Sequence, residues 1–480
     1  MEEKGKAHKG HESLHVAMFP WLAMGHLIPF FHLSKHLAQK GHKISFISTP
    51  RNLQRLPKIP QILSPLINLI SVPFPHVPNL TPHAESSTGV SYSKQQLLRI
   101  AVDELQPTIT SFLESSKLDW IICDFASHWL PSTAAELGVR CCFFGLFNAA
   151  LHCLVGPPAV LVGGSDPRKT LEDYVRVPEW IPFESNVAFR SYEITRFLQL
   201  SSGYSSVMPD TVRMGTTIRD SEVVAVRSCI EFEPEWFDLL RELYQKPLVP
   251  VGFLPPFMED DEDVSDVKWV GIKEWFDEQR FNSVVYVALG TEALLSQEEV
   301  NELALGLEKS GLSFFWVLSD PPESTQKAID MLPNGFLQRV EGRGKVCTEW
   351  APQVKILSHD SVGGFLTHCG WNTIIEGLAL GRVLILLSMI NDQGANATLL
   401  LEKGLGIEVA RKEDGLFTSD AVAESRRIAM VDDPGSSLRA SNKEAKKLFG
   451  DRETNQRCID EFIQYLVEQK EKKKNSLRHH

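Results

Sequence analysis

The sequence predicts an α/β protein built from two doubly wound domains with parallel sheets. Short apolar runs of strand length alternate with helical patterns in both halves of the chain, which is typical of parallel strands joined by helical crossovers. The 480 residues exceed what one hydrophobic core usually serves. Residues 246–266 are rich first in proline and then in acidic side chains, and we expect the domain linker there.

The N-terminal domain is predicted to span residues 1–245. Its apolar runs have strand length, and the segments between them show helical spacing. The predicted elements are strands at 14–20, 43–49, 118–125 and 140–147 and helices at 26–40 and 129–137. A turn at 21–25 joins the first strand to the first helix, which ends before Gly41.

The C-terminal domain is predicted to span residues 267–455 and shows the same alternation. The predicted elements are strands at 283–289, 313–318, 345–349, 362–366 and 383–387 and helices at 296–309 and 371–380. Residues 456–480 are expected to form a last helix, at about 456–470, and a lysine-rich tail that is solvated.

Composition argues against several classes of protein. No apolar stretch reaches the roughly 18 residues of a membrane span, although 43% of the residues are hydrophobic. The charged N-terminal segment lacks the apolar core of a secretory leader, so we expect a cytoplasmic location. A net charge of −12 disfavours a nucleic-acid binder. The 8 cysteines include no CxxC pair and are expected to be free thiols.

The segment Thr367-His-Cys-Gly-Trp-Asn-Thr-Ile-Ile-Glu-Gly377 allows three interpretations: a metal site, a nucleophile or a cradle for an anion. A zinc site needs further ligands at suitable spacing, and none lies near His368 and Cys369. Cys369 follows an apolar strand and is expected to be a buried structural thiol. The anion cradle fits better, because Gly370 permits a tight turn between a strand and a helix N-terminus, where doubly wound sheets bind ligands.

Polar side chains at this turn favour the same interpretation. Asn372 and Thr373 add donors at the helix N-terminus, and His368 adds one from the end of the strand. Glu376 lies one helical turn after Asn372, where a carboxylate can accept hydrogen bonds from vicinal ribose hydroxyls. Ordinary helix capping by Asn372 and Thr373 explains this short stretch equally well, so the local pattern leaves both interpretations open.

A longer pattern decides between them. Residues 350–393 read WAPQVKILSHDSVGGFLTHCGWNTIIEGLALGRVLILLSMINDQ and closely resemble the signature of plant UDP-sugar-dependent glycosyltransferases of family 1. The roles that this resemblance implies are uracil stacking for Trp350, uridine binding for Ala351 and Gln353, diphosphate binding for His368, Asn372 and Thr373, ribose binding for Glu376, and contacts to the sugar hydroxyls for Trp371, Asp392 and Gln393. Thr291 is expected to add a hydroxyl near the diphosphate.

The resemblance extends to the N-terminal half. Residues 19–29 (FPWLAMGHLIP) resemble the family's catalytic loop and residues 121–124 (IICD) its partner strand, which implies that His26 is the base and Asp124 its orienting carboxylate. A histidine in a loop is more often simply solvated, but both residues follow predicted parallel strands and would emerge at one edge. The family's GT-B architecture implies two Rossmann-like domains facing across a cleft, with the last helix crossing back to the first domain.

Three positions depart from the signature. Thr373 stands where serine is usual and keeps the hydroxyl. Gly-Arg-Val at 381–383 replaces Gly-Val-Pro, and Ser388 replaces a proline, so the stiffness of the chain near the sugar differs. The UDP part of the donor is therefore better specified than its sugar.

Two other patterns suggest a metal only weakly. His32 and His36 lie four apart but lack the glutamate of a zinc-protease helix, and we expect them at the surface or in an interface. Asp261-Glu-Asp263 matches the acid-x-acid pattern with which another class of sugar transferases holds a divalent metal, but it lies in an acidic linker. A helix end and His368 would neutralise UDP, so neither a metal nor another cofactor is expected.

The expected reaction is a one-step, inverting displacement in which His26 accepts the proton of an acceptor hydroxyl. Residues 124–131 and 286–292 resemble the branch that adds glucose or rhamnose from UDP-sugar to the sugar of flavonoid, steroid or terpenoid glycosides, and the polar stretch 79–88 is expected to contact such an acceptor. Transfer to a bare aglycone is the alternative. A non-catalytic nucleotide-sugar-binding protein and a metal-dependent nucleotide hydrolase are the competing classes. The sequence does not determine the donor sugar, the acceptor and linkage, the oligomeric state or the source tissue.

Overall fold

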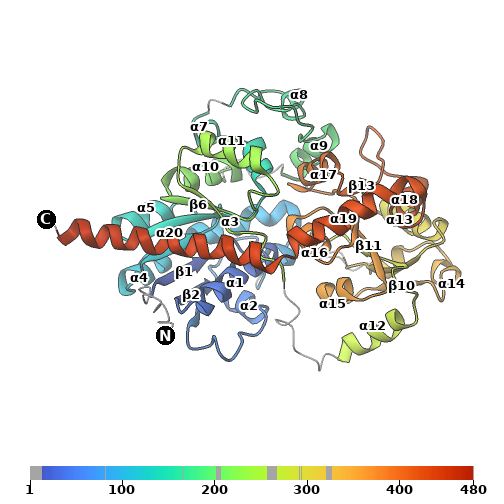
Figure 1. Ribbon diagram of the computed structural model, residues 1–480, viewed down its shortest axis with the longest axis horizontal. Helices are drawn as coiled ribbons and strands as arrows, with labels where there is room; N and C mark the ends of the chain where they lie inside the picture. Colours follow the sequence, from blue (N-terminus) through green and yellow to red (C-terminus); the bar gives the residue numbers. More distant parts are fainter. Residues whose placement is uncertain are drawn as a thin grey trace, which may run out of the picture.

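A computed structural model describes residues 13–81, 83–164, 166–201, 207–256, 267–290, 292, 295–320 and 327–478. The described strands form two parallel sheets, one from each half of the chain (Figure 1). The N-terminal sheet contains β1 His15–Phe19, β2 Lys43–Ser48, β3 Ile67–Ser71, β4 Trp120–Cys123, β5 Arg140–Gly145, β6 Val223–Val226 and β7 Leu248–Pro250. The C-terminal sheet contains β8 Val284–Ala288, β9 Ser313–Val317, β10 Gly344–Cys347, β11 Val362–Thr367, β12 Val383–Leu386 and β13 Gly406–Glu408.

Helices cover both sheets. The N-terminal half contains α1 Met24–Gln39, α2 Pro50–Gln54, α3 Gln95–Glu104, α4 Gln106–Ser115, α5 Leu130–Glu136, α6 Ala149–Val155, α7 Pro158–Val162, α8 Leu171–Tyr174, α9 Ser191–Ser201, α10 Asp210–Asp220 and α11 Pro234–Tyr244. The C-terminal half contains α12 Val267–Asp277, α13 Gln297–Lys309, α14 Phe336–Arg339, α15 Gln353–Ser358, α16 Trp371–Ala379, α17 Gln393–Glu402, α18 Ser419–Met430 and α19 Ser436–Phe449, and α20 Arg452–Arg478 follows.

The two sheets share one topology. The strand orders are β3-β2-β1-β4-β5-β6-β7 and β10-β9-β8-β11-β12-β13. In each, the chain starts in the middle, builds toward one edge and then returns to build the other side, so the order reverses between β1 and β4 and between β8 and β11. Loops diverge at the carboxyl ends of such a strand pair, and this is where doubly wound sheets bind ligands.

Alternating side chains bury both faces of each sheet. In β1, Val16 and Met18 pack with α1 and α20, while Ala17 and Phe19 pack with α3 and α4 on the other face. In β8, Tyr286 faces α16, and Val287 faces α13 and α18. Because parallel sheets are covered on both sides, their strands are almost continuously apolar, which explains why these strands were recognisable in the sequence.

The structure confirms the nine strands expected from the sequence and adds β3, β6, β7 and β13. β7 and β13 have 3 residues each, too few for a periodic pattern. β7 lies within residues 246–266, of which 257–266 fall outside the described residues, so the division of the chain at this linker stays a prediction. The first helix starts at Met24 rather than at residue 26, which places His26 in its first turn.

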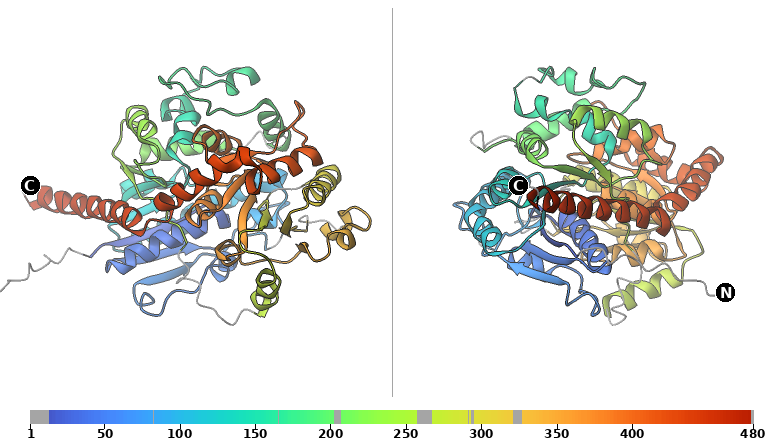
Figure 2. Two further views of the ribbon diagram at one scale, coloured as in Figure 1. Left: turned by 45° about the vertical axis from the view of Figure 1, so that its right-hand side comes forward. Right: turned by 60° about the vertical axis from the view of Figure 1, so that its left-hand side comes forward.

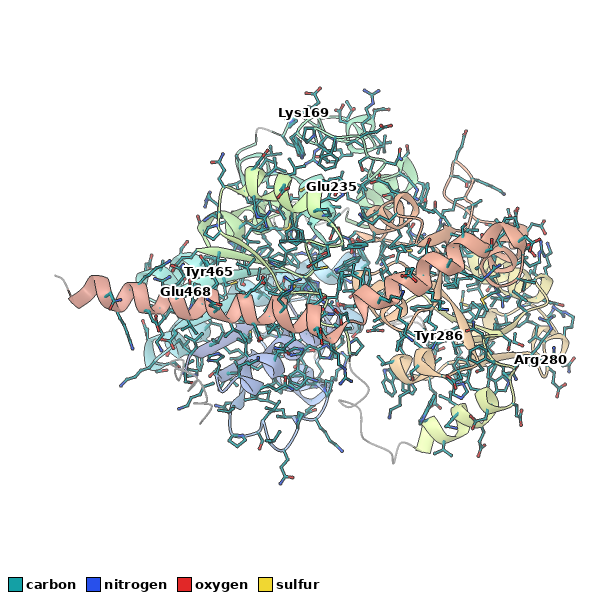
Figure 3. The ribbon with its side chains drawn as sticks, in the orientation of Figure 1. Lys169, Glu235, Arg280, Tyr286, Tyr465 and Glu468 are labelled. Atoms are coloured by element: carbon teal, nitrogen blue, oxygen red, sulfur yellow. The ribbon has the colours of Figure 1, made fainter. Side chains whose placement is uncertain are left out.

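The last helix returns to the N-terminal half. α20 runs across that half in Figure 1, where Tyr465 and Glu468 are labelled on it in Figure 3, and its end projects beyond the other elements in the left view of Figure 2. The Trp120 indole donates a hydrogen bond to the Leu466 carbonyl over 3.2 Å. The helix continues to Arg478, and Lys473 donates to the Gly138 carbonyl, so the segment expected to be a solvated tail is partly held by this half.

Candidate active site

His26 and Asp124 meet at the switch point of the N-terminal sheet. β1 and β4 are neighbours in parallel register, and the two residues follow the carboxyl ends of these strands. Nδ1 of His26 donates to Oδ2 of Asp124 over 2.7 Å. The backbone N–H groups of Trp21 and Phe125 donate to the same carboxylate, over 3.1 and 2.7 Å. Because Asp124 takes Nδ1, Nε2 is the ring nitrogen left for a substrate.

The surroundings of His26 raise its pKa. Burial is the largest influence and opposes the shift, but attraction to Asp124, the hydrogen bond between them and the charges of Glu292 and Asp392 outweigh it. The side chains of His26 and Asp124 are 19% and 4% exposed. A nearly buried carboxylate beside a more accessible imidazole is the arrangement in which a histidine takes up a proton and the resulting imidazolium is stabilised.

The turn between β11 and α16 leaves the helix N-terminus open. Gly370 is the N-cap residue, and no side chain caps the helix. Thr373 donates to the Gly370 carbonyl over 2.8 Å and also contacts the Thr367 hydroxyl, so its hydroxyl stabilises the turn. Asn372 does not cap the helix, and its amide NH2 donates to the Gly25 carbonyl over 2.8 Å. The amides of this first turn therefore suit an anion, whereas the capping interpretation finds no support.

His368 lies between two glycines. A Cβ at Gly290 would lie 3.0 Å from Nε2 of His368, and one at Gly370 only 2.7 Å from it. A side chain at either position would therefore crowd the imidazole, and glycine leaves room for it. Burial lowers the pKa of His368 to about 4. The ring is therefore neutral at pH 7 and offers a hydrogen bond rather than the positive charge expected from the sequence.

The residues expected to bind the nucleoside gather near the same sheet edge. Trp350 is 68% exposed, while Ala351 is buried. Gln353 donates to the Glu376 carboxylate over 2.6 Å and accepts from the hydroxyl of Tyr286, which Figure 3 labels in β8. Burial raises the pKa of Glu376, against the opposing effects of Gln353 and Arg227. The structure thus brings together an exposed indole and an amide–carboxylate pair.

The residues expected at the sugar are held by protein partners. Oε1 of Gln393 accepts the backbone N–H groups of Met389 and Ile390, both over 2.9 Å. Asp392 accepts from Asn396 over 2.7 Å, and burial raises its pKa to about 6. The Trp371 indole is buried and donates to the Arg227 carbonyl over 2.8 Å. The sugar contacts of these residues stay predictions.

Comparison with known proteins identifies the family. Residues 250–432 match the family described as UDP-glucoronosyl and UDP-glucosyl transferase. UDP-glycosyltransferase 91C1 of Arabidopsis thaliana is 56% identical over 95% of this chain and 97% of its own length. The chain belongs to the plant UDP-glycosyltransferases.

Other relatives of this UDP-glycosyltransferase carry more specific names. Soyasaponin III rhamnosyltransferase of Glycine max is 38% identical over 94% of this chain and 95% of its own length. Anthocyanidin 3-O-glucoside 2''-O-glucosyltransferase of Ipomoea purpurea is 30% identical over 94% and 97%. Among solved structures, UGT73P12 of Glycyrrhiza uralensis superposes with a TM-score of 0.79, at 22% identity, over 98% of this chain and 100% of its own. The UDP-glycosyltransferase therefore has the GT-B fold of these plant enzymes.

Three residues considered in the sequence lie outside the part of the chain that the structure describes. Thr291, Asp261 and Asp263 fall outside the described residues. Within the described residues, no group of three or more His, Cys, Asp or Glu side chains is placed to hold a metal ion, and no helix is long and apolar enough to cross a membrane. Cys369 is buried, and burial raises its pKa, as expected for a structural thiol.

Two further expectations concern buried groups. All 8 cysteines of the UDP-glycosyltransferase are free, as predicted. His32, expected at the surface or in an interface, is instead buried in α1, where burial and then the charges of Lys35 and Arg227 lower its pKa. This environment makes it a core histidine.

Sequence reasoning missed Arg227, which contacts the site from the other half of the enzyme. It follows β6 directly, and its guanidinium donates to Oδ1 of Asn372. A charged residue directly after the apolar run 223–226 was a usable signal, but that strand itself had not been recognised.

Proposed function

We propose that this UDP-glycosyltransferase transfers glucose or rhamnose from UDP-sugar to a hydroxyl of a sugar that is already attached to a small molecule. The observation that carries the reaction is the 2.8 Å hydrogen bond from Asn372 to the carbonyl of Gly25. Gly25 precedes His26, so this bond joins the loop of the base to the helix N-terminus of the anion cradle. An attacking hydroxyl and a leaving diphosphate need these two groups side by side.

In the proposed mechanism, Nε2 of His26 accepts the proton of the acceptor hydroxyl while that oxygen forms a bond to the anomeric carbon. The bond from this carbon to the UDP oxygen breaks at the same time, and UDP leaves with the electron pair from the opposite face. One displacement inverts the anomeric centre. Asp124 stabilises the imidazolium, and the amides at the start of α16, with Asn372 and His368, stabilise charge on the diphosphate.

The proposal of a glycoside acceptor rests on the relatives. One acts by name on an anthocyanidin 3-O-glucoside with glucose as the transferred sugar, and another is by name a rhamnosyltransferase. The polar stretch 79–88 adds little support, because Arg55 donates to the hydroxyls of Ser86 and Thr88, and Ser87 donates to Glu292. These hydroxyls link loops of the protein to one another.

The test is a mass-spectrometric screen of purified enzyme with UDP-glucose and UDP-rhamnose against matched pairs of aglycone and monoglucoside. We expect a higher kcat/KM for the monoglucoside in most pairs, with the product heavier by one sugar. A consistent preference for aglycones would support the alternative acceptor class instead. Binding of UDP without turnover on any acceptor would support a non-catalytic nucleotide-sugar-binding protein.

Two finer properties belong to this proposal. The donor is bound without a metal, since the helix N-terminus supplies the positive end of a dipole. The enzyme resides in the cytoplasm, where a reducing environment keeps its 8 cysteines as free thiols. Fractionation of source tissue, with activity recovered in the cytosolic fraction, tests this location.

A further inference from the structure

Arg227 is a buried cation between the two halves of the enzyme. The residue is only 3% exposed, and burial lowers its pKa to about 9, so it remains charged at pH 7. Within the described residues, no carboxylate is in ion-pair contact with it, although the charge of Glu376 partly opposes the effect of burial, and its hydrogen-bond partners are neutral oxygens. Burying a charge without a contacting counter-ion is costly, and such a charge is usually matched by hydrogen bonds or by a ligand.

The partners of Arg227 come from three parts of the chain. Nε donates to the Phe253 carbonyl over 2.8 Å and Nη2 to the Leu254 carbonyl over 3.4 Å, both just after β7. Nη1 donates to Oδ1 of Asn372 in α16. The Arg227 carbonyl accepts the indole N–H of Trp371 over 2.8 Å. Arg227 therefore connects β6 and the segment after β7 to the first turn of the helix that we assign to the diphosphate.

The chemistry of these groups determines how Asn372 is oriented. A guanidinium can only donate hydrogen bonds, so only the oxygen end of the Asn372 amide can face Arg227 as an acceptor. The NH2 end must then point away from Arg227, and it donates to the Gly25 carbonyl beside His26. Without Arg227, the amide could rotate and present its oxygen, which would repel both a carbonyl and a phosphate.

We propose that Arg227 is a positioning residue for the transfer reaction, which holds the Asn372 amide with its NH2 group toward the catalytic loop and the donor diphosphate. This inference rests on the function proposed above. It assigns to Arg227 an effect that passes through Asn372, and it differs from a direct contact between the guanidinium and the phosphate, which would act without Asn372.

A double-mutant cycle separates the two. Arg227→Met keeps the length of the side chain but removes its donors and charge, and Asn372→Ala removes the amide. We expect each single variant to lower the affinity for UDP, measured by calorimetry, by roughly tenfold, as for a lost hydrogen bond to a charged group. The value of kcat/KM should fall by roughly the same factor. In the double variant, Arg227→Met should add less than about twofold to the effect of Asn372→Ala. Effects that multiply would overturn the proposal, as would unchanged UDP affinity in Arg227→Met.

Controls distinguish positioning from general stability. Arg426 is likewise buried and donates to the Leu307 and Ser313 carbonyls, but it lies in the core of the C-terminal half. Arg426→Met should lower the Tm while leaving the UDP affinity of the folded enzyme within about twofold. If Arg227→Met does not fold, Arg227→Lys replaces it in the cycle, since it keeps the charge and loses the fork of donors. Failure of the wild type to bind UDP would instead refute the proposed function.

Discussion

Nδ1 of His26 lies 2.7 Å from Oδ2 of Asp124, although 98 residues separate them in the chain. The parallel pairing of β1 with β4 brings them together, because both residues follow the carboxyl ends of neighbouring strands. Two backbone N–H groups hold the carboxylate in place. Strand pairing and backbone hydrogen bonds thus position the pair at the carboxyl edge of the sheet.

His26→Ala should abolish transfer and leave UDP binding nearly unchanged. The imidazole acts on the acceptor hydroxyl, whereas the nucleotide is assigned to the other half of the protein. Loss of a general base lowers kcat by roughly 10²- to 10⁴-fold. Single-turnover kinetics with UDP-glucose and calorimetry with UDP measure the two effects. Turnover retained above one tenth of the wild-type rate would assign the base to another residue.

The pH profile of kcat/KM should show an acid limb set by His26. A base must be neutral to accept a proton, and the pKa of His26 is raised above 6.5, so activity should fall as the pH decreases through this raised value. Asp124→Asn removes the main attraction that raises the pKa. Its limb should therefore move to lower pH, and its plateau rate should drop sharply. An acid limb that does not move would separate Asp124 from the titration of the base.

Transfer should continue in excess EDTA. The open N-terminus of α16, with His368 and Asn372 beside it, provides donors that stabilise the diphosphate in place of a divalent cation. Initial rates before and after chelation, with and without added Mg²⁺ or Mn²⁺, check this. Activity lost with EDTA and restored by either cation would direct attention to Asp261 and Asp263.

Ser388, which stands where the signature has proline, should tune the sugar end of the donor site. Its hydroxyl donates to Glu193 over 2.9 Å, and Glu193 also accepts from the Arg190 backbone over 2.9 Å. This bond holds the chain just before Asp392 against the N-terminal half. Ser388→Ala should raise the KM for UDP-sugar by roughly threefold to tenfold, as for one lost hydrogen bond.

UDP itself lacks the sugar, so its affinity should not change in Ser388→Ala. Ser388→Thr keeps the hydroxyl and serves as the matched control. Equal effects on UDP and on UDP-sugar would contradict a role confined to the sugar end.

The sequence alone was sufficient to predict features that depend on residues close together in the chain. Strands buried on both faces are nearly continuous apolar runs, so β1, β4, β8 and β11 and the polar residues that follow them could be recognised. The signature at 350–393 determined the family, because its residues are close along the chain. Gly370 and the helix after it also followed from local rules of turns and helix ends.

Only the tertiary structure decided which side chains remain available to a substrate. The partners of Asn372 lie 347 residues away at Gly25 and 145 residues away at Arg227, and no local pattern encodes such contacts. The amide of Gln393 and the indole of Trp371 have the chemistry to bind a sugar, but their partners depend on how the loops and both halves pack. The hydrogen-bond partners of Asn372 and Trp371 come from distant parts of the chain, so the pairing of each side chain follows from the complete fold.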